Sequence, residues 1–380
     1  MKKKIKLLNI ISTLNPQYGG ASTATIDLSL SLINKNFSVD IVTNDPIKSN
    51  FLKSKKVRVF NLGQGFGDYN FSFNLFLWIK KNSNKYDKFI FHGLWQFNTI
   101  VARLLLKNNF YVFTHGQLDP YFATENIKKY KKIIYWYLIE KKNLESSQSI
   151  LLTNKNEEKL QNSTFVNTNG IKKKIINIGI IKPNFNKNNL KKIFIKKFPN
   201  LVGKIFFLFL GRFHKKKGCD ILLESFSRIL DKRDINLLMV GPNNQYKEEL
   251  IKLSQKLKIS KNVIWSDTLL DKYKWSVIYN AKAMVLSSNG ENFGVSLAES
   301  LSMGVPVLTT NKVNIHNIIK LTNSGFISSN NVKSFTNSMK NFLNINRKKN
   351  NKMKINAKKC FDKYFNLENN QEKLIQLLKN

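Results

Sequence analysis

Short apolar runs alternate with helical patterns along most of this chain. Runs such as IKLLNII at residues 5–11 and INLLMVG at residues 235–241 are typical of buried strands, and most of the stretches between such runs have helical spacing. Strands that are joined by helices form parallel sheets with both faces covered. The alternation therefore predicts an α/β fold, and this restricts the possible architectures more than any other feature of the sequence.

The alternation forms two series of comparable length, and 380 residues exceed one ordinary hydrophobic core. The polar segment NFNKNNLKK at residues 184–192 separates the series and is the best candidate for a linker. We therefore expect two Rossmann-like domains with a cleft between them. The predicted segments are an N-terminal domain over residues 1–185, a C-terminal domain over residues 186–355, and a basic helix over residues 356–380 that packs back toward the first domain.

The composition is strongly basic, with 63 Lys and Arg against 24 Asp and Glu and a formal net charge of +39. Such a charge attracts anions, including nucleotides, phospholipid surfaces and nucleic acids. A genome biased toward Lys, Asn and Ile explains the charge equally well, so its origin stays open. A nucleic-acid-binding protein is the alternative that charge alone suggests, but the sequence contains no nucleic-acid-binding motif.

The two cysteines, Cys219 and Cys360, are too few for a disulfide framework or a cysteine-based metal site. They fit a reducing cytoplasm. The start MKKKIKLLNIIS imitates a signal peptide, but it lacks a small-residue cleavage site and is better read as a first strand. No apolar run approaches the roughly 20 residues that span a bilayer. We expect a cytoplasmic protein that is soluble or lies on a membrane surface.

The segment NGENFGVSLAESLSMGVPV at residues 289–307 places Glu291 in a glycine-containing loop and Glu299 in the helix that follows. An apolar strand, AMVLSS, precedes the loop, so the loop lies at the carboxyl end of a parallel strand, where α/β sheets bind ligands. Two glutamates at this spacing also occur on solvated helix faces, and the spacing alone would not identify a site.

A second strand-to-helix turn, in FLFLGRFHKKKGCD, carries Arg212 and Lys217. A guanidinium, an ammonium and a helix N-terminus together suit a diphosphate, although a solvated basic loop is the simpler interpretation of this turn by itself. A third turn contains Gly19 and Gly20, which allow close backbone approach or simply make a tight turn. His92 and His115 each end a strand beside a glycine, and neither has metal-ligand spacing.

Taken together, these segments resemble the family 4 retaining glycosyltransferases of the GT-B fold, especially those of bacterial polysaccharide and O-antigen biosynthesis. The resemblance runs from Gly19 to about Phe326 and includes HGLW, THGQLDPYF, LFLGRFHKKKG, DKYKWSVIYNAKAMVLSS and ENFGVSLAESLSMGVPVL. It implies a GT-B architecture with two parallel-sheet domains. It also implies transfer of a sugar from a nucleotide-diphosphate sugar to a glycan or lipid-linked acceptor with retention of configuration. A GT-B-like sugar-nucleotide epimerase is the other alternative.

The resemblance also assigns roles at the donor. Glu291 is expected to contact hydroxyls of the donor sugar and Glu299 to bind the ribose. Arg212 and Lys217 are expected to hold the diphosphate, and His115 is expected to face the donor sugar near the reacting carbon. The remaining expected donor contacts are backbone groups of Asn292, Phe293, Gly294, Gly19 and Gly20.

We expect no metal and no cofactor, because Arg and Lys neutralise the diphosphate in place of a cation. Two positions depart from the family: Asp267–Thr268 follow the strand near the expected base site, and Asn177–Ile180 replace an Asn-Gly turn. Finally, NIKKYKKIIYWYLIEKKN at residues 126–143 combines Lys pairs with apolar residues at helical spacing. This segment is either a core helix or a helix that lies on an anionic membrane.

Overall fold

The computed structural model describes residues 4–33, 35–52, 54–119, 126–161, 165–230 and 234–379. The chain divides into two compact units. Unit 1 consists of residues 1–181 and 367–380, and unit 2 consists of residues 182–366. The chain therefore passes from unit 1 to unit 2 and returns to unit 1 near its C-terminus.

Unit 1 contains a seven-stranded parallel sheet in the order β3-β2-β1-β4-β5-β6-β7. In this sheet Ile5 of β1 aligns with Phe37 of β2, and Leu7 of β1 aligns with Lys88 of β4. The strand order reverses between β1 and β4, and the carboxyl ends of strands at such a point commonly bind ligands. The strands are β1 (Ile5–Ile11), β2 (Phe37–Thr43), β3 (Arg58–Asn61), β4 (Lys88–His92), β5 (Tyr111–Phe113), β6 (Ser149–Leu152) and β7 (Lys173–Ile175).

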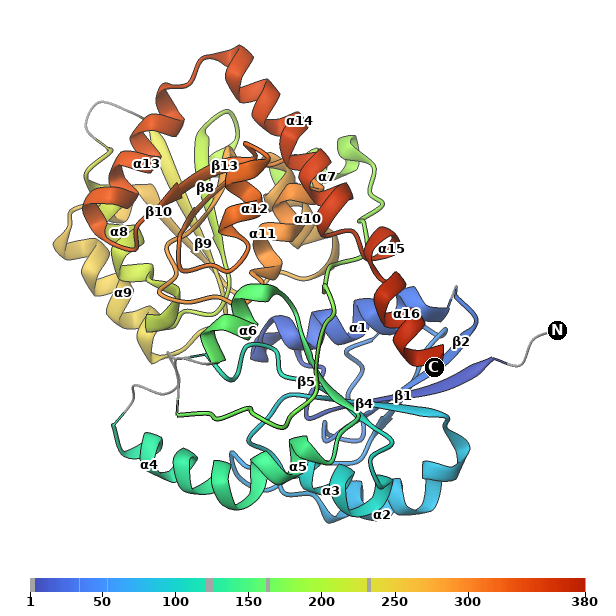
Figure 1. Ribbon diagram of the computed structural model, residues 1–380. Coiled ribbons are helices and arrows are strands. Elements are labelled where there is room, and N and C mark those ends of the chain that lie inside the picture. Colours follow the sequence, from blue (N-terminus) through green and yellow to red (C-terminus); the bar gives the residue numbers. More distant parts are fainter. Residues whose placement is uncertain are drawn as a thin grey trace. The chain divides into compact units, whose positions relative to one another are not determined.

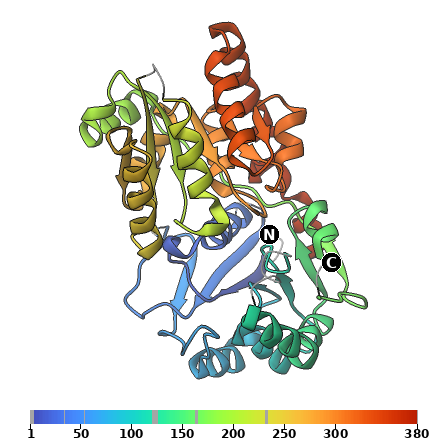
Figure 2. The same cartoon turned by 90° about the vertical axis from the view of Figure 1, so that its left-hand side faces the viewer.

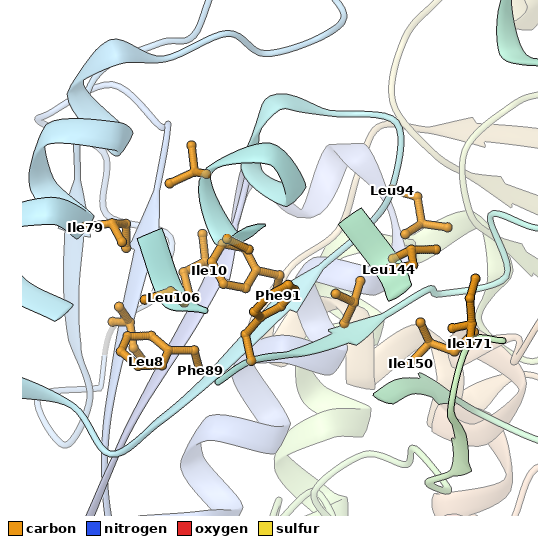
Figure 3. Packing of buried hydrophobic residues seen from close by; sticks show 14 of the residues in the cluster. Leu8, Ile10, Ile79, Phe89, Phe91, Leu94, Leu106, Leu144, Ile150 and Ile171 are labelled. Carbon is orange, nitrogen blue, oxygen red and sulfur yellow. The ribbon is translucent and has the colours of Figure 1, made fainter. Parts of the chain in front are cut away.

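Helices cover both faces of the unit 1 sheet (Figure 1). Because side chains alternate along a strand, Leu8 and Ile10 of β1 join one core cluster with Ile79 and Phe91, as Figure 3 shows, whereas Ile11 joins a second cluster beside the first helix. The helices are α1 (Gly20–Ile33), α2 (Phe73–Asn82), α3 (Phe97–Leu106), α4 (Asn126–Tyr135), the π-helical turn η4 (Trp136–Glu140), α5 (Lys141–Glu145), α6 (Lys155–Gln161), α15 (Leu367–Asn370) and α16 (Glu372–Lys379).

Unit 2 contains a six-stranded parallel sheet in the order β10-β9-β8-β11-β12-β13, with the reversal between β8 and β11. Figure 2 shows the strands of this sheet with helices packed beside them. Ala283 of β11 aligns with Phe207 of β8. The strands are β8 (Ile205–Leu210), β9 (Ile235–Val240), β10 (Val263–Ser266), β11 (Ala283–Leu286), β12 (Val307–Thr310) and β13 (Gly325–Ser328). The helices are α7 (Lys187–Lys197), α8 (Cys219–Ser227), α9 (Gln245–Lys256), α10 (Asp271–Asn280), α11 (Val295–Ser302), α12 (His316–Leu321), α13 (Val332–Asn344) and α14 (Arg347–Tyr364).

The strand order of unit 2 is that of the Rossmann fold, and the first six strands of unit 1 follow the same order. The prediction of two parallel-sheet α/β units is therefore confirmed. The strand β13 was not predicted from the sequence.

The predicted linker at residues 184–192 is wrong, because most of it forms the first turns of α7. The side chain of Asn186 caps this helix by accepting from the backbone N–H groups of Asn188 and Asn189. Leu190 and Phe194, four residues apart, are buried on one face of the helix. The polar composition of the segment belongs to the exposed face of this helix.

The divisions between the units also differ from the predicted segments. Helix α14 runs from Arg347 to Tyr364 without a break, so residue 355 lies inside a helix of unit 2. The return to unit 1 occurs at Leu367, whose N–H donates to the carbonyl of Ile180 at 3.1 Å. The predicted Asn177–Ile180 departure therefore lies where the C-terminal segment pairs with unit 1.

Candidate active site

The turn between β8 and α8 carries Arg212 and Lys217. Residues Lys215–Lys217 form a 3-10 turn, which His214 caps by accepting from the Lys216 N–H at 3.0 Å. Gly218 follows with a φ of 61°, and a Cβ atom at this position would lie 2.2 Å from the carbonyl oxygen of Ser287. Glycine is needed here for both its backbone conformation and the close approach to the end of β11.

Side chains from the segment after β11 hold this turn in place. The Ser287 hydroxyl donates to the Gly218 carbonyl at 2.6 Å, and the Ser288 hydroxyl donates to the Lys216 carbonyl at 2.8 Å. The amide of Asn289 donates to the Lys215 carbonyl at 2.9 Å. The two loops that carry the predicted phosphate and sugar contacts are therefore one hydrogen-bonded structure.

Lys217 and Glu291 form an ion pair across these two loops. Their side chains are 21% and 20% exposed, so the pair lies at the boundary between protein and solvent. Burial alone would raise the pKa of Glu291, but Lys217, followed by Lys216 and Arg212, lowers it below the ordinary glutamate value. Glu291 is thus a carboxylate at neutral pH, surrounded by three cations.

The Arg212 side chain is exposed on the same turn. It makes no hydrogen bond or ion pair with the residues that the structure describes. Its charge nevertheless contributes to the lowered pKa of Glu291, which places Arg212 in the same electrostatic environment as Lys217. A guanidinium in this position is available to bind an anion at the carboxyl end of β8.

The Glu291 loop is fixed by backbone pairing with the segment after β12. The Glu291 N–H donates to the Lys312 carbonyl at 3.1 Å, and the Asn314 N–H donates to the Glu291 carbonyl at 2.9 Å. The amide of Asn314 also donates to Asn292 Oδ1 at 3.3 Å. These contacts hold the loop without using the Glu291 carboxylate.

The rest of this loop connects to the hydrophobic core and to α11. Phe293 is buried and packs edge-on against Phe365, with ring centroids 5.6 Å apart. Gly294, with a φ of 71°, precedes the first residue of α11. The predicted residues Asn292, Phe293 and Gly294 therefore shape the loop and direct α11 away from it.

Glu299 lies on α11, and its side chain is only 4% exposed. Its Oε1 accepts from Lys274 Nζ of α10 at 2.5 Å. The same ammonium lies 4.7 Å from the ring centroid of Trp275. Sequence reasoning did not identify Lys274, because the contact joins two helices that are separated by a strand. Lys274 contacts Oε1 of Glu299 and leaves the second carboxylate oxygen for another partner.

The predicted residues of unit 1 also lie at the carboxyl edge of its sheet. Gly19 ends a 3-10 turn (Pro16–Tyr18) after β1 with a φ of 118°, and Gly20 is the first residue of α1. Asp45, which follows β2, accepts from the Leu14 N–H at 2.8 Å and from the Thr13 hydroxyl at 2.5 Å. Asp45 therefore holds the start of the loop that contains both glycines.

His115 follows β5 and is bonded to His92 at the end of β4, with His92 Nδ1 2.9 Å from His115 Nε2. Burial and the neighbouring His115 lower the pKa of His92 well below its ordinary value. Burial lowers the pKa of His115 to about 4. Both rings are therefore neutral at physiological pH. The sequence placed both histidines at strand ends but did not predict this pair.

The departure at Asp267 lies at the end of β10, where Asp267 Oδ1 is 3.3 Å from Lys247 Nζ. Asp267 is well exposed and Lys247 is mostly buried. Because Lys247 contacts Asp267, it lies at the same edge of the unit 2 sheet. The described residues contain no group of three or more His, Cys, Asp and Glu side chains that could hold a metal ion.

Lysines also gather at the opposite edge of the unit 2 sheet. A pocket of about 530 Å³ lies at the amino ends of β8, β11 and β12. Burial and the neighbouring Lys354 lower the pKa of Lys282, which lines the pocket. The lining lysines are Lys187, Lys191, Lys204, Lys282, Lys354 and Lys358. The positive charge of this chain is therefore not confined to the candidate active site.

Sequence comparison relates part of this chain to known proteins. Residues 191–360 match the family described as glycosyl transferases group 1. The alpha-1,3/1,6-mannosyltransferase ALG2 of Dictyostelium discoideum is 25% identical over 183 residues, which cover 42% of this chain and 44% of that protein. A 2-deoxystreptamine N-acetyl-D-glucosaminyltransferase of Niallia circulans is 30% identical over 114 residues, which cover 29% of this chain and 28% of that protein. The match thus spans less than half of each relative.

Solved structures resemble the whole chain. A sucrose-phosphate synthase from Thermosynechococcus elongatus has a TM-score of 0.79 at 18% identity and covers 98% of both chains. Anabaena Alr3699/HepE, solved in complex with UDP and glucose, has a TM-score of 0.79 at 14% identity and covers 99% of both chains. At such identities the likeness establishes the fold, and the predicted GT-B fold is confirmed.

Proposed function

We propose that this chain is a retaining glycosyltransferase, because residues 191–360 match the glycosyl transferases group 1 and the chain has the GT-B fold. It would transfer a sugar from a nucleoside-diphosphate sugar to a glycan or lipid-linked acceptor in cell-surface polysaccharide biosynthesis. The matched family and the fold favour this activity over a nucleic-acid-binding protein or an epimerase.

The observation that carries the proposal is the Lys217–Glu291 pair on two interlocked loops at the β8/β11 reversal. A cation and a carboxylate in contact can divide the recognition of a sugar diphosphate between them. Lys217, with Arg212, binds the diphosphate oxygens, and Glu291 accepts hydrogen bonds from hydroxyls of the sugar. The relative Alr3699/HepE was solved with UDP and glucose, which is ligand chemistry of this kind.

Glu299 is proposed to bind the ribose. Its carboxylate is almost fully buried and has Lys274 on Oε1, so Oε2 is the oxygen proposed to accept from a ribose hydroxyl. The hydrogen bond from Lys274 holds the Glu299 carboxylate in place without a ligand, so the site is preorganised. Backbone groups of Asn292, Phe293 and Gly294 would complete the donor contacts.

In the proposed reaction, the bond from the anomeric carbon to the diphosphate breaks and a bond to the acceptor oxygen forms on the same face of the sugar. The acceptor hydroxyl passes its proton to the departing diphosphate oxygen. Negative charge develops on the leaving group as the sugar becomes oxocarbenium-like, and Arg212 and Lys217 stabilise that charge. These two cations are proposed to do so without a metal ion or another cofactor.

Unit 1 is proposed to supply the acceptor side and also some of the donor contacts. Gly19 and Gly20 would allow the backbone after β1 to approach the donor, and His115 would face a hydroxyl of the donor sugar. The protein is proposed to work at the cytoplasmic face of the membrane. Among the described residues, no helix combines the length and apolar character of a membrane span.

The helical segment α4–η4–α5 supports peripheral membrane association. Its inner face is buried through Trp136 and Leu144, which confirms that one face belongs to the core. Its outer face exposes apolar side chains beside lysines, the combination that binds anionic interfaces. The exposed apolar residues are Tyr130 (71%), Ile134 (59%), Tyr137 (52%) and Leu138 (63%).

Mass spectrometry of reactions with a panel of nucleotide sugars, with and without lipid-linked acceptors, tests the proposed function. A product that is heavier than its acceptor by one sugar residue, formed by the parent and not by Arg212→Ala, is the expected result. If no donor in the panel were hydrolysed and no sugar were transferred to any acceptor, the result would count against the proposal.

A further inference from the structure

A chain of hydrogen bonds in unit 1 leads from the backbone of α1 to His115. Its first link is the Ser29 hydroxyl, which donates to the Thr25 carbonyl at 2.7 Å. A carbonyl only accepts, so the Ser29 hydrogen is committed and the Ser29 oxygen accepts from Asn9 Nδ2 at 3.0 Å. The amide of Asn9 is therefore oriented with its nitrogen toward Ser29.

This orientation fixes His92. Asn9 presents Oδ1 to His92 Nε2 at 3.0 Å, and an amide oxygen only accepts. The proton of neutral His92 must therefore be on Nε2. The ring is 2% exposed and stacks on Phe113, with centroids 5.6 Å apart. A neutral imidazole protonated on Nε2 has a lone pair on Nδ1.

The lone pair of His92 fixes His115 in turn. His92 Nδ1 lies 2.9 Å from His115 Nε2, so Nε2 of His115 must carry the proton and donate it. The backbone holds the ring in this position. His115 has a φ of 48°, and the carboxylate of Glu157 accepts from the Gly116 N–H at 2.8 Å and from the Thr114 hydroxyl.

We propose that His92 is a positioning residue that holds His115 in the Nε2–H form, so that His115 presents Nδ1 to its ligand as a hydrogen-bond acceptor. His115 therefore takes a ligand hydroxyl and rejects an anionic or carbonyl oxygen at this atom. The identity of that hydroxyl as a sugar hydroxyl rests on the proposed function. The protonation pattern itself rests only on the contacts of unit 1.

The pattern is measurable without any substrate. Long-range proton–nitrogen correlation spectra distinguish the protonated from the bare nitrogen of each neutral histidine, and this chain has four histidines. We expect the Nε2–H form for both His92 and His115. His316 is an internal control, because its Nδ1 lies 2.8 Å from the Val313 carbonyl and must donate, which gives the Nδ1–H form.

Substitution of Asn9 tests the direction of the chain. Asn9→Leu removes the acceptor for His92, whereas Asn9→Gln keeps an uncharged amide with both an acceptor oxygen and a donor nitrogen. We expect Asn9→Leu to give a mixture of protonation forms at His115 and Asn9→Gln to retain the Nε2–H form. The His316 signals report unit 2 and remain unchanged in both variants, and a thermal unfolding transition like that of the parent shows that unit 1 is folded.

The rate of sugar transfer then measures the effect of the His115 protonation form on activity. We expect Asn9→Leu to lower kcat roughly two- to tenfold, the size of one net hydrogen bond, and Asn9→Gln to keep kcat closer to that of the parent. Affinity for the free nucleoside diphosphate is unchanged in both. A parent His115 protonated on Nδ1 would overturn the proposal even if the chain transfers sugar. An inactive parent with the expected spectra would instead count against the proposed function.

Discussion

Lys217 and Glu291 are 74 residues apart in the sequence, yet their side chains form an ion pair between the loops that follow β8 and β11. Each loop is held by hydrogen bonds that do not involve the side chains of the pair. Ser287, Ser288 and Asn289 hold the lysine turn, and Asn314 holds the glutamate loop. The two charges are therefore brought together by the fold, and under the proposed function a diphosphate would exchange places with one partner without unfolding either loop.

The Lys217–Glu291 pair is predicted to make the stability of the protein depend on pH. Because the pKa of Glu291 is lowered, its stabilising contribution is complete above the ordinary glutamate pKa of about 4.3 and disappears as the pH falls through the lower folded value. We expect Lys217→Met to lower the free energy of unfolding near neutral pH and to have little effect at acid pH. Urea denaturation across this range measures the difference. Lys216→Met, whose charge acts on Glu291 less strongly, is the control and should show a smaller effect.

Gly218 is predicted to be essential for the lysine turn. Gly218→Ala places a Cβ atom 2.2 Å from the Ser287 carbonyl in addition to straining a left-handed backbone. We expect a loss of about 2–4 kcal/mol, from about 1–2 kcal/mol of backbone strain and the rest from the displaced loop. Gly203→Ala is the matched control, because Gly203 has a φ of 78° and no atom within 4 Å of the new methyl. Equal losses in the two variants, measured by chemical denaturation, would contradict the close-approach argument.

Lys274 is predicted to stabilise unit 2. Lys274→Met leaves the nearly buried carboxylate of Glu299 without its cation, and we expect a loss of up to about 3 kcal/mol. Lys182→Met breaks the exposed pair with Asp362, where both side chains are about two-fifths exposed, and should cost about 1 kcal/mol or less. If thermal unfolding gave the two variants the same melting temperature, the Lys274–Glu299 contact would not stabilise unit 2 more than the exposed pair does.

Membrane association is predicted to depend on the outer face of α4–η4–α5. The triple substitution Tyr130→Ser, Ile134→Ser and Leu138→Ser removes exposed apolar area and leaves the buried face intact. We expect the parent to co-sediment with anionic liposomes at low salt and the variant to remain largely in the supernatant. Ile195→Ser and Leu321→Ser, which alter exposed apolar residues of unit 2, are controls that should bind like the parent.

The periodicity of the sequence is sufficient to predict the parallel sheets, because fully buried strands appear as continuous apolar runs. It is not sufficient to identify α7, since the exposed face of that helix is so rich in Asn and Lys that it resembles a linker. The cap at Asn186 and the pair Leu190 and Phe194 were the local signals of a helix. The return of the chain at Leu367 has no local signal, because its bond to Ile180 joins distant segments.

Some residues of the candidate site could likewise be predicted from the sequence, and others could not. Arg212, Lys217, Glu291 and Glu299 were predicted from the family resemblance, and the turns and helix starts in the sequence indicated only that they lie at strand ends. Lys274 was missed, since nothing in its own helix indicates a buried carboxylate on the next one. The pair of His92 and His115 was within reach of sequence reasoning, because β4 and β5 are neighbours and their carboxyl ends meet at one edge.

The most direct test of the account is calorimetric titration of the nucleoside diphosphate from the productive donor into the parent, Glu291→Gln and Glu299→Gln. The account predicts that Glu299→Gln weakens binding roughly ten- to a hundredfold, because the ribose loses a hydrogen bond to a charged group. Glu291→Gln should bind the nucleotide at least as tightly as the parent, since Lys217 is released from its carboxylate, and yet fail to transfer sugar. If both variants bound the nucleotide like the parent, or if Glu291→Gln transferred sugar at the parent rate, the assignment of these two glutamates would be wrong.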